Sequence, residues 1–302
     1  MRVGFLAALG SAICYALSYC FLRKGQAESS PPDYGLLPIL AMSAISLSGV
    51  AIIEYMVGGR LIKPGADLPV PVLWATCSGI VGTFLGRMLL YRAVNQLGAV
   101  RGVVLKGVSP VATMAVAAFA LGEDPSFDDG IGLCGVLGSI LLLVIESRLR
   151  KHRAARFAFQ SAAVIGITAA CIQGVGHVFR QLSVQTGLSP LPAAAIDLSA
   201  ATSTYVIWLL FRGTLLPLLR WYAQHLNFWL AVAGWCSAAG VFLFFFAADH
   251  ASVSTVAILA ASEPVFVALF SALFLARLER LSWWSGAAAL LIGLSAMMLV
   301  TS

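Results

Sequence analysis

Two stretches of the chain decide its fold: "LYRAVNQLGAVRGVVLKGVSPV" at residues 90–111 and "FFFAADHASVSTVAILAASEPV" at residues 244–265. At an offset of 154 residues, Pro110 aligns with Pro264, and an alanine and a leucine are also shared. The same offset pairs glycines outside these stretches. A repeat at one fixed offset indicates internal duplication. The chain is therefore predicted to consist of two copies of one unit.

The composition places both copies in a lipid bilayer. Of the 302 residues, 60% are hydrophobic and 11% are charged, and the mean hydropathy is +0.92; a soluble domain is about a quarter charged. A spanning helix needs roughly 20 apolar residues. Segments of about that length, five in each half, are predicted to be helices: 3–22, 35–57, 71–94, 97–121, 131–147, 159–182, 191–212, 227–249, 251–276 and 282–301.

The odd number of helices in each copy fixes the relation between the copies. After five crossings, the second copy enters the membrane from the opposite side, which produces an inverted repeat. We therefore expect an all-α integral membrane protein of ten transmembrane helices, arranged as two inverted five-helix repeats. The first repeat should span residues 1–147 and the second residues 157–302, joined by a basic linker at residues 148–156.

The linker also predicts the orientation. It holds the densest group of cations in the chain: Arg148, Arg150, Lys151, Arg153 and Arg156. Cytoplasmic loops carry an excess of lysine and arginine, so the linker should be cytoplasmic and both termini outside. A multi-pass protein of the cell (inner) membrane is expected. This loop bias accounts for the net charge of +6, and since no basic patch is interleaved with aromatic residues, no nucleic-acid partner is expected.

Several local motifs carry a family resemblance. They are Ala93 with Gly98-Ala99, the central Pro110, Gly122-Glu123, and Glu263-Pro264 in the second copy. With these motifs the sequence resembles the EamA-type family of the drug/metabolite transporter superfamily. The end of the ninth helix, "LARLER" at residues 275–280, departs from the Gly-Glu expected there. The resemblance implies helices 1–4 and 6–9 around a central cavity, with helices 5 and 10 at the periphery, and it favours export.

Three charged residues lie deep in the predicted helices. Arg87 and Lys106 lie nine and ten residues from Gln96 in the turn between helices 3 and 4, which corresponds to a depth of about 14 Å. Glu263 lies about 20 Å beyond the equivalent turn. Intramembrane charges mark functional sites by default, so all three are predicted to bind substrate. The alternative is an internal ion network that holds the repeats together.

Helix 6 supplies a second polar face. Gln173, His177 and Arg180 follow i, i+4 and i+7 spacing and therefore share one side of the helix. Gln173 and His177 are predicted to bind substrate, and His177 could carry a coupled proton. The alternative is hydrogen bonding to a neighbouring helix. Arg180 is expected to reach the interface by snorkelling, and Asp197, near the start of helix 7, is expected at a gate or interface.

Four tyrosines complete the predicted substrate site. Tyr15 and Tyr19 share one face of helix 1, Tyr91 lies on helix 3, and Tyr205 lies on helix 7. Each could contact a polar cargo, and the alternative for each is packing between helices.

Prolines and glycines of the spanning segments have structural explanations. Pro110 and Pro264 should each kink a helix beside the cavity, because proline removes one backbone hydrogen bond. Gly79, Gly82 and Gly86 on helix 3 should allow close approach of a neighbouring helix.

The expected function is secondary transport of small organic solutes by alternating access, most simply as an exporter. An excess of deep cations favours a carboxylate or amino acid as cargo. The sequence has no P-loop, which leaves proton coupling or exchange as the energy source. No cofactor, metal site or catalytic residue is expected. Two alternatives remain: a lipid-carrier flippase of the same fold, with a cavity that opens sideways to lipid, and a membrane-embedded enzyme, which would need clustered histidine or aspartate residues.

The orientation can be tested by thiol labelling of intact cells. We expect a membrane-impermeant reagent to label Arg2→Cys from outside, and His152→Cys only after permeabilisation, because the basic linker is predicted to be cytoplasmic. The unsubstituted protein gives the background of its own cysteines. Labelling of position 152 in intact cells would overturn the orientation.

Overall fold

The computed structural model describes residues 2–122, 127–149, 153–225, 227–276, 278 and 282–301. The described residues are helical apart from loops and one isolated bridge between Ile62 and Leu188. Among them, eight helices are long and apolar enough to cross a membrane. Phe127–Leu149 and Trp283–Thr301 are two further long helices. With them, the described residues contain the ten helices that the sequence predicts. Glu123 and linker residues 150–152 lie outside the described residues.

The first half contains the following elements: α1 (Arg2–Ser29), α2 (Leu36–Met56), α3 (Pro69–Ser78), the π-helix η1 (Gly79–Leu85), α4 (Gly86–Leu97), α5 (Ala99–Lys106), α6 (Ser109–Leu121) and α7 (Phe127–Leu149). The second half contains α8 (Arg153–Gln185), α9 (Pro190–Phe211), α10 (Leu215–Gln224), α11 (Phe228–Ala248), α12 (Val253–Ala260), α13 (Glu263–Phe274) and α14 (Trp283–Thr301). The third span thus consists of α3, η1 and α4, and the fourth and ninth spans each consist of two shorter helices.

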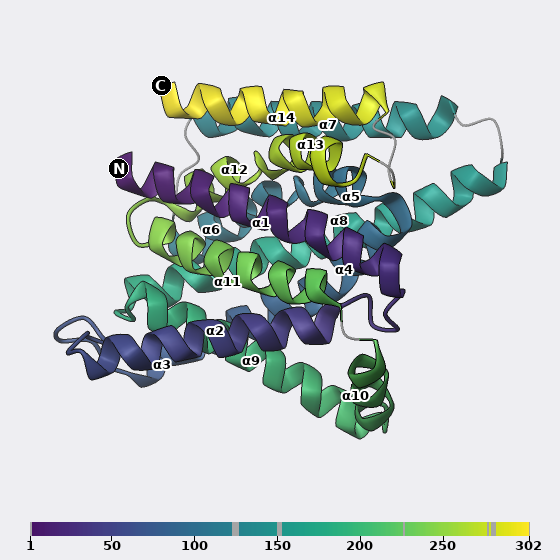
Figure 1. The fold of residues 1–302 in the computed structure, drawn as a ribbon. Helices are drawn as coiled ribbons and strands as arrows, with labels where there is room; N and C mark the ends of the chain where they lie inside the picture. The colour runs from purple at the N-terminus through teal and green to yellow at the C-terminus, as the bar shows by residue number, and fades with distance from the viewer. Residues whose placement is uncertain are drawn as a thin grey trace.

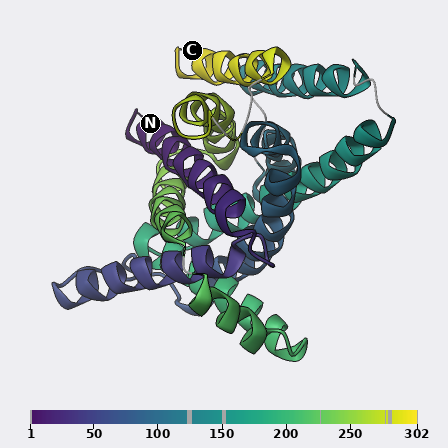
Figure 2. The ribbon, with the colours of Figure 1, turned by 45° about the vertical axis from the view of Figure 1, so that its right-hand side comes forward.

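The two halves run in opposite directions and exchange their first helices. Figure 1 shows α1 and α8 crossing the molecule in opposite senses, as do α2 and α9. Helix α1 packs on α11 and α13 of the second half, while α8 packs on α4 and α6 of the first. Helices α7 and α14 pack together at one edge (Figures 1 and 2). The interface between the repeats therefore runs through the middle of the molecule.

Small residues bring the two halves into close contact. A Cβ atom added to Gly82 would lie 2.9 Å from Cα of Gly176 on α8, so the two backbones touch. The hydroxyls of Ser11 and Ser18 on α1 each donate to a carbonyl of α11 at 2.8 Å, and the Ser43 hydroxyl on α2 does so at 2.7 Å. In a bilayer, close packing and interhelical hydrogen bonds replace the hydrophobic effect as the force between helices.

The fourth and ninth spans are both interrupted near their centres. Helix α5 ends at Lys106 and α6 begins at Ser109; helix α12 ends at Ala260 and α13 begins at Glu263. Pro110 and Pro264 each occupy the second residue of the new helix, where the N–H that proline lacks would have no helical partner. Two helix N-termini are thereby placed inside the protein, and Glu263 lies in a first turn, where the helix dipole favours a negative charge.

Helix α10 was not expected, because residues 215–224 were assigned to a loop. It lies apart from the bundle in Figure 1 and exposes Leu216 and Leu219. The hydroxyl of Tyr222 donates to Asp33, which also accepts from Tyr205 at 3.2 Å. Burial and the Asp33 carboxylate raise the pKa of Tyr222, so the hydroxyl stays protonated and can donate. This contact attaches α10 to the loop between α1 and α2.

On the side of the two termini, loop 57–68 is fastened to the second half. Lys63 forms an ion pair with Asp249 and donates from Nζ to the Val184 carbonyl at 3.2 Å. The bridge between Ile62 and Leu188 adds backbone pairing. These contacts cover the end of the repeat interface on this side.

The glycine contact can be tested with two matched substitutions. Gly82→Val inserts a side chain where α8 touches η1, and such overpacking costs about 1–3 kcal/mol. We expect a clearly lower thermal unfolding midpoint for the purified protein. Gly49→Val is the control, since nothing lies within 4 Å of a Cβ at Gly49. Equal midpoints for the two variants would contradict the close contact.

Candidate functional site

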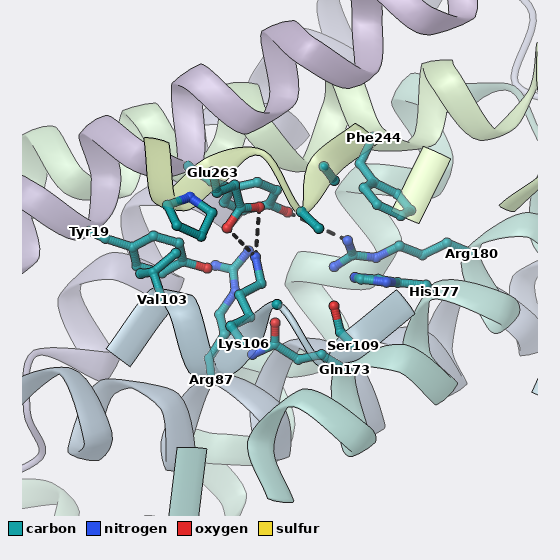
Figure 3. A pocket seen from close by; sticks show the side chains of 16 residues that line it. Tyr19, Arg87, Val103, Lys106, Ser109, Gln173, His177, Arg180, Phe244 and Glu263 are labelled. Atoms are coloured by element: carbon teal, nitrogen blue, oxygen red, sulfur yellow. Dashed lines mark hydrogen bonds and ion pairs between the residues drawn. The ribbon is translucent and has the colours of Figure 1, made fainter. Parts of the chain in front are cut away.

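A small cavity lined by several charged and polar side chains lies where the two halves meet. Its volume is about 20 Å³, and Figure 3 shows the side chains that line it. They come from α1, η1, α4 and the α5/α6 break of the first half and from α8, α11 and the α12/α13 break of the second. A cavity needs at least about 10–15 Å³ to hold one water. The cavity therefore has room for about one water.

The central interaction of the cavity is an ion pair between the halves. Lys106 Nζ lies 2.7 Å from Oε1 and 2.6 Å from Oε2 of Glu263. The ammonium also lies 4.8 Å from the ring centroid of Tyr15 and 5.2 Å from that of Tyr19, within reach of cation–π attraction. Lys106 is the last residue of α5 and Glu263 the first of α13. The pair thus joins the two helix breaks.

A second buried ion pair corrects one expectation. Arg180 is 4% exposed rather than snorkelling to the interface, and its partner Asp197 is fully buried outside the cavity lining. Arg180 Nε lies 3.4 Å from Asp197 Oδ1, and its Nη2 donates to the Thr83 hydroxyl at 2.8 Å. Asp197 also accepts from Thr83 at 2.6 Å and from Ser78. Depth counted along the chain did not reveal that α8, α9 and η1 bring these groups together.

Arg87 has a different environment from the other two cations. It is the second residue of α4, is 4% exposed, and donates from Nη1 to the Ser237 hydroxyl at 2.6 Å. Its guanidinium carbon lies 5.7 Å from the ring centroid of Tyr15. Nη2 of Arg87 and Nε2 of Gln173 have no hydrogen-bond partner among the described residues. Both side chains line the cavity.

His177 lies on the same wall as Gln173 and Arg180, so the three side chains share one face of α8 as the spacing predicted. The imidazole packs on Phe244, with ring centroids 4.5 Å apart. Its Nδ1 lies 3.4 Å from the Thr113 hydroxyl. His177 is therefore held between α6 and α11.

Seven of the nine predicted substrate-binding residues line the cavity: Tyr15, Tyr19, Arg87, Lys106, Gln173, His177 and Glu263. Tyr91 does not line the cavity; its ring packs edge to face against that of Tyr19, with the ring centroids 6.5 Å apart. Tyr205 does not, because its hydroxyl is directed to Asp33. Of the two prolines at the breaks, Pro264 lines the cavity, and in the first half Ser109 lines it in place of Pro110.

Sequence analysis missed three residues that shape the site. Thr83 and Ser237 bind the buried arginines, and Phe244 forms part of the cavity wall. Thr83 lies four residues before Arg87, but a threonine, a serine or a phenylalanine in an apolar helix is too common to single out. Which of them touches an arginine depends on how the helices cross.

Comparison with known proteins agrees with this architecture. The model of the EamA-like transporter family matches residues 2–145 and 160–301, one match in each half. A crystal structure of a protein with 16% identical residues is similar over 96% of this chain and 94% of its own, with a TM-score of 0.62. That likeness concerns the fold alone. No curated protein matches the sequence.

The central ion pair can be tested by a double-mutant comparison. Glu263→Gln leaves Lys106 buried without its counter-charge, and breaking a buried pair in this way costs about 3–5 kcal/mol. The double variant Lys106→Met/Glu263→Gln removes the orphaned charge, so we expect it to recover part of the lost stability. The readout is the unfolding midpoint of the purified protein.

The control is the Lys63–Asp249 pair, in which the Lys63 side chain is 44% exposed. Asp249→Asn should cost about 1 kcal/mol or less. A Glu263→Gln variant as stable as Asp249→Asn would show that the central pair contributes no more than a surface pair.

Proposed function

Because the chain belongs to the EamA-like transporter family and is a membrane transporter of the drug/metabolite type, we propose that it carries small organic metabolites by secondary active transport. The observation that supports this most directly is the polar cavity between the inverted halves, with the Lys106–Glu263 pair at its centre. Transporters built from inverted repeats bind cargo at the repeat interface near the bilayer midplane, often beside broken helices.

The proposed mechanism is alternating access. With a volume of about 20 Å³, the cavity is too small for an organic solute, so cargo enters only when the halves move apart. The breaks in the fourth and ninth spans give each half a point that can bend. The Lys63–Asp249 contact closes the side of the termini, and the Asp33 contacts with Tyr205 and Tyr222 lie at the other end of the repeat interface. We propose that these two sets of contacts open in turn.

The direction, location and coupling follow from the charge pattern and the family resemblance. We propose export across the inner membrane, with the linker at 148–156 cytoplasmic and joining repeats at 1–147 and 157–302. Three buried cations line the cavity against the single carboxylate of Glu263, which favours a carboxylate or amino acid as cargo. Protons are the proposed coupling ion, with His177 and Glu263 as the groups able to exchange them in the cavity.

One observation favours the second candidate, a lipid-carrier flippase. A crevice of about 540 Å³ lies between α2, α3 and α9, and its lining includes Ile52 and Tyr55, which are exposed on the outer surface. A lipid chain could enter such a crevice from the side. Its lining contains no charged side chain that would hold a phosphate headgroup. We therefore place the solute transporter first.

The proposal is tested by efflux from proteoliposomes with a panel of amino acids, organic acids, cationic dyes and a labelled lipid. We expect at least one small solute to move, and Glu263→Gln and Lys106→Ala each to lower its rate roughly tenfold or more, the effect of losing one charged hydrogen bond. Glu54→Gln is the control, since Glu54 is exposed at the end of α2.

If the wild type and both variants transport every compound at the same rate, the proposal that cargo binds in the cavity is contradicted. Movement of the lipid alone would favour the flippase.

A further inference from the structure

Two buried nitrogen donors of the cavity lack a hydrogen-bond partner in the part of the chain that the structure describes. Arg87 is 4% exposed and Gln173 is 6% exposed. Arg87 Nη2 and Gln173 Nε2 are each without a hydrogen-bond partner among the described residues, although both side chains line the cavity. A buried donor left unpaired loses its hydration without compensation. Such a pair of donors is therefore expected to receive a partner from outside the chain.

The charges of the cavity indicate the sign of that partner. Arg180 is paired with Asp197, and Lys106 is paired with Glu263. For Arg87, the described residues provide a neutral hydroxyl from Ser237 and no carboxylate within ion-pair distance. The site thus carries one positive charge in excess. Because an uncompensated charge is costly in a nonpolar medium, an anion is the ligand that the site favours.

Gln173 packs against the helix that carries Arg87, and both side chains line the same cavity. Gly86, the residue before Arg87, has no side chain, and an added Cβ atom there would lie 2.5 Å from Cγ of Gln173. Gln173 therefore lies directly against the start of α4. In Figure 3, Gln173 lies on the side of the cavity away from Glu263, and the head of the Arg87 side chain lies beside Lys106, which pairs with Glu263.

We propose that Arg87 and Gln173 form a subsite for a carboxylate group, with Arg87 Nη2 donating to one oxygen and Gln173 Nε2 to the other. Two separate donors suit a ligand that offers two acceptor atoms, and carboxylates form strong charge-assisted hydrogen bonds with arginine. The inference rests on the proposed function, since the carboxylate would belong to the cargo. It goes further by naming the two residues that bind it and by assigning Lys106 to Glu263 instead of to the cargo.

The test measures binding, not transport. The thermal unfolding midpoint of the purified full-length chain is followed with benzoate, with its neutral counterpart benzamide, and with chloride at the same ionic strength. A ligand that binds the folded state raises the midpoint with concentration. We expect benzoate to raise it and the other two to have no such effect. Arg87→Gln and Gln173→Leu should each weaken binding, which raises the half-saturating benzoate concentration roughly 10- to 100-fold.

Gln181→Leu is the matched control. Gln181 is a buried glutamine of the same helix, it is absent from the cavity lining, and its Nε2 faces the Ala251 carbonyl at 3.5 Å. The Gln181→Leu variant should bind benzoate with the same affinity as the wild type. Equal shifts with benzamide or chloride, or equal affinities in Gln173→Leu and Gln181→Leu, would overturn the subsite.

The outcome is separable from that of the proposed function. Benzoate binding that depends on Arg87 and Gln173, in a protein that moves no solute in proteoliposomes, would support the subsite and contradict transport. Carboxylate transport at the same rate by the wild type, Arg87→Gln and Gln173→Leu would support transport and contradict the subsite.

Discussion

The structure depends on the requirement that every charge inside a bilayer has a partner, because no water is present to solvate it. Lys106 and Glu263 neutralise each other. Arg180 on α8 and Asp197 on α9 do the same. The first pair connects the two halves at their breaks, and the second fixes α8 to α9 within the second half. Arg87 is the exception, since the described residues offer it no carboxylate and it donates to the neutral Ser237 hydroxyl. Among the buried charges of the cavity, Arg87 is therefore the one without an ion-pair partner among the described residues.

The inverted repeat explains why the pairs lie where they do. Each half contributes one interrupted helix, and each interruption places a helix N-terminus near the middle of a span. The halves are related in backbone but not in side chain: Ser109 stands where the second half has Glu263, and Ala260 stands where the first half has Lys106. The shared backbone provides one break in each half, and the differing side chains place a cation before the first break and a carboxylate after the second. Exchange of α1 and α8 between the halves then encloses both positions.

The general plan of the site could be predicted because it follows from local properties of the chain. Seven of the nine predicted residues lie on the cavity wall, since depth follows from the helical rise and a common face follows from i, i+4 spacing. Tyr91 and Tyr205 lie outside the cavity lining, because a tyrosine at the correct depth can still pack against another ring or turn its hydroxyl to a carboxylate elsewhere. Helix α10 was missed because its ten residues are too few to span the membrane.

By itself, the sequence determined that the protein is a membrane protein of two inverted five-helix copies with a broken fourth and ninth span, because hydropathy, duplication and proline position can all be read along the chain. Only the tertiary structure decided which charges meet. Arg180 pairs with Asp197, and Arg87 is left with a serine, because of where α8, α9 and α11 cross the π-helix and the start of α4. A π-helix changes the direction of every side chain that follows it, and contacts between helices from different halves depend on crossing angles that no single segment encodes.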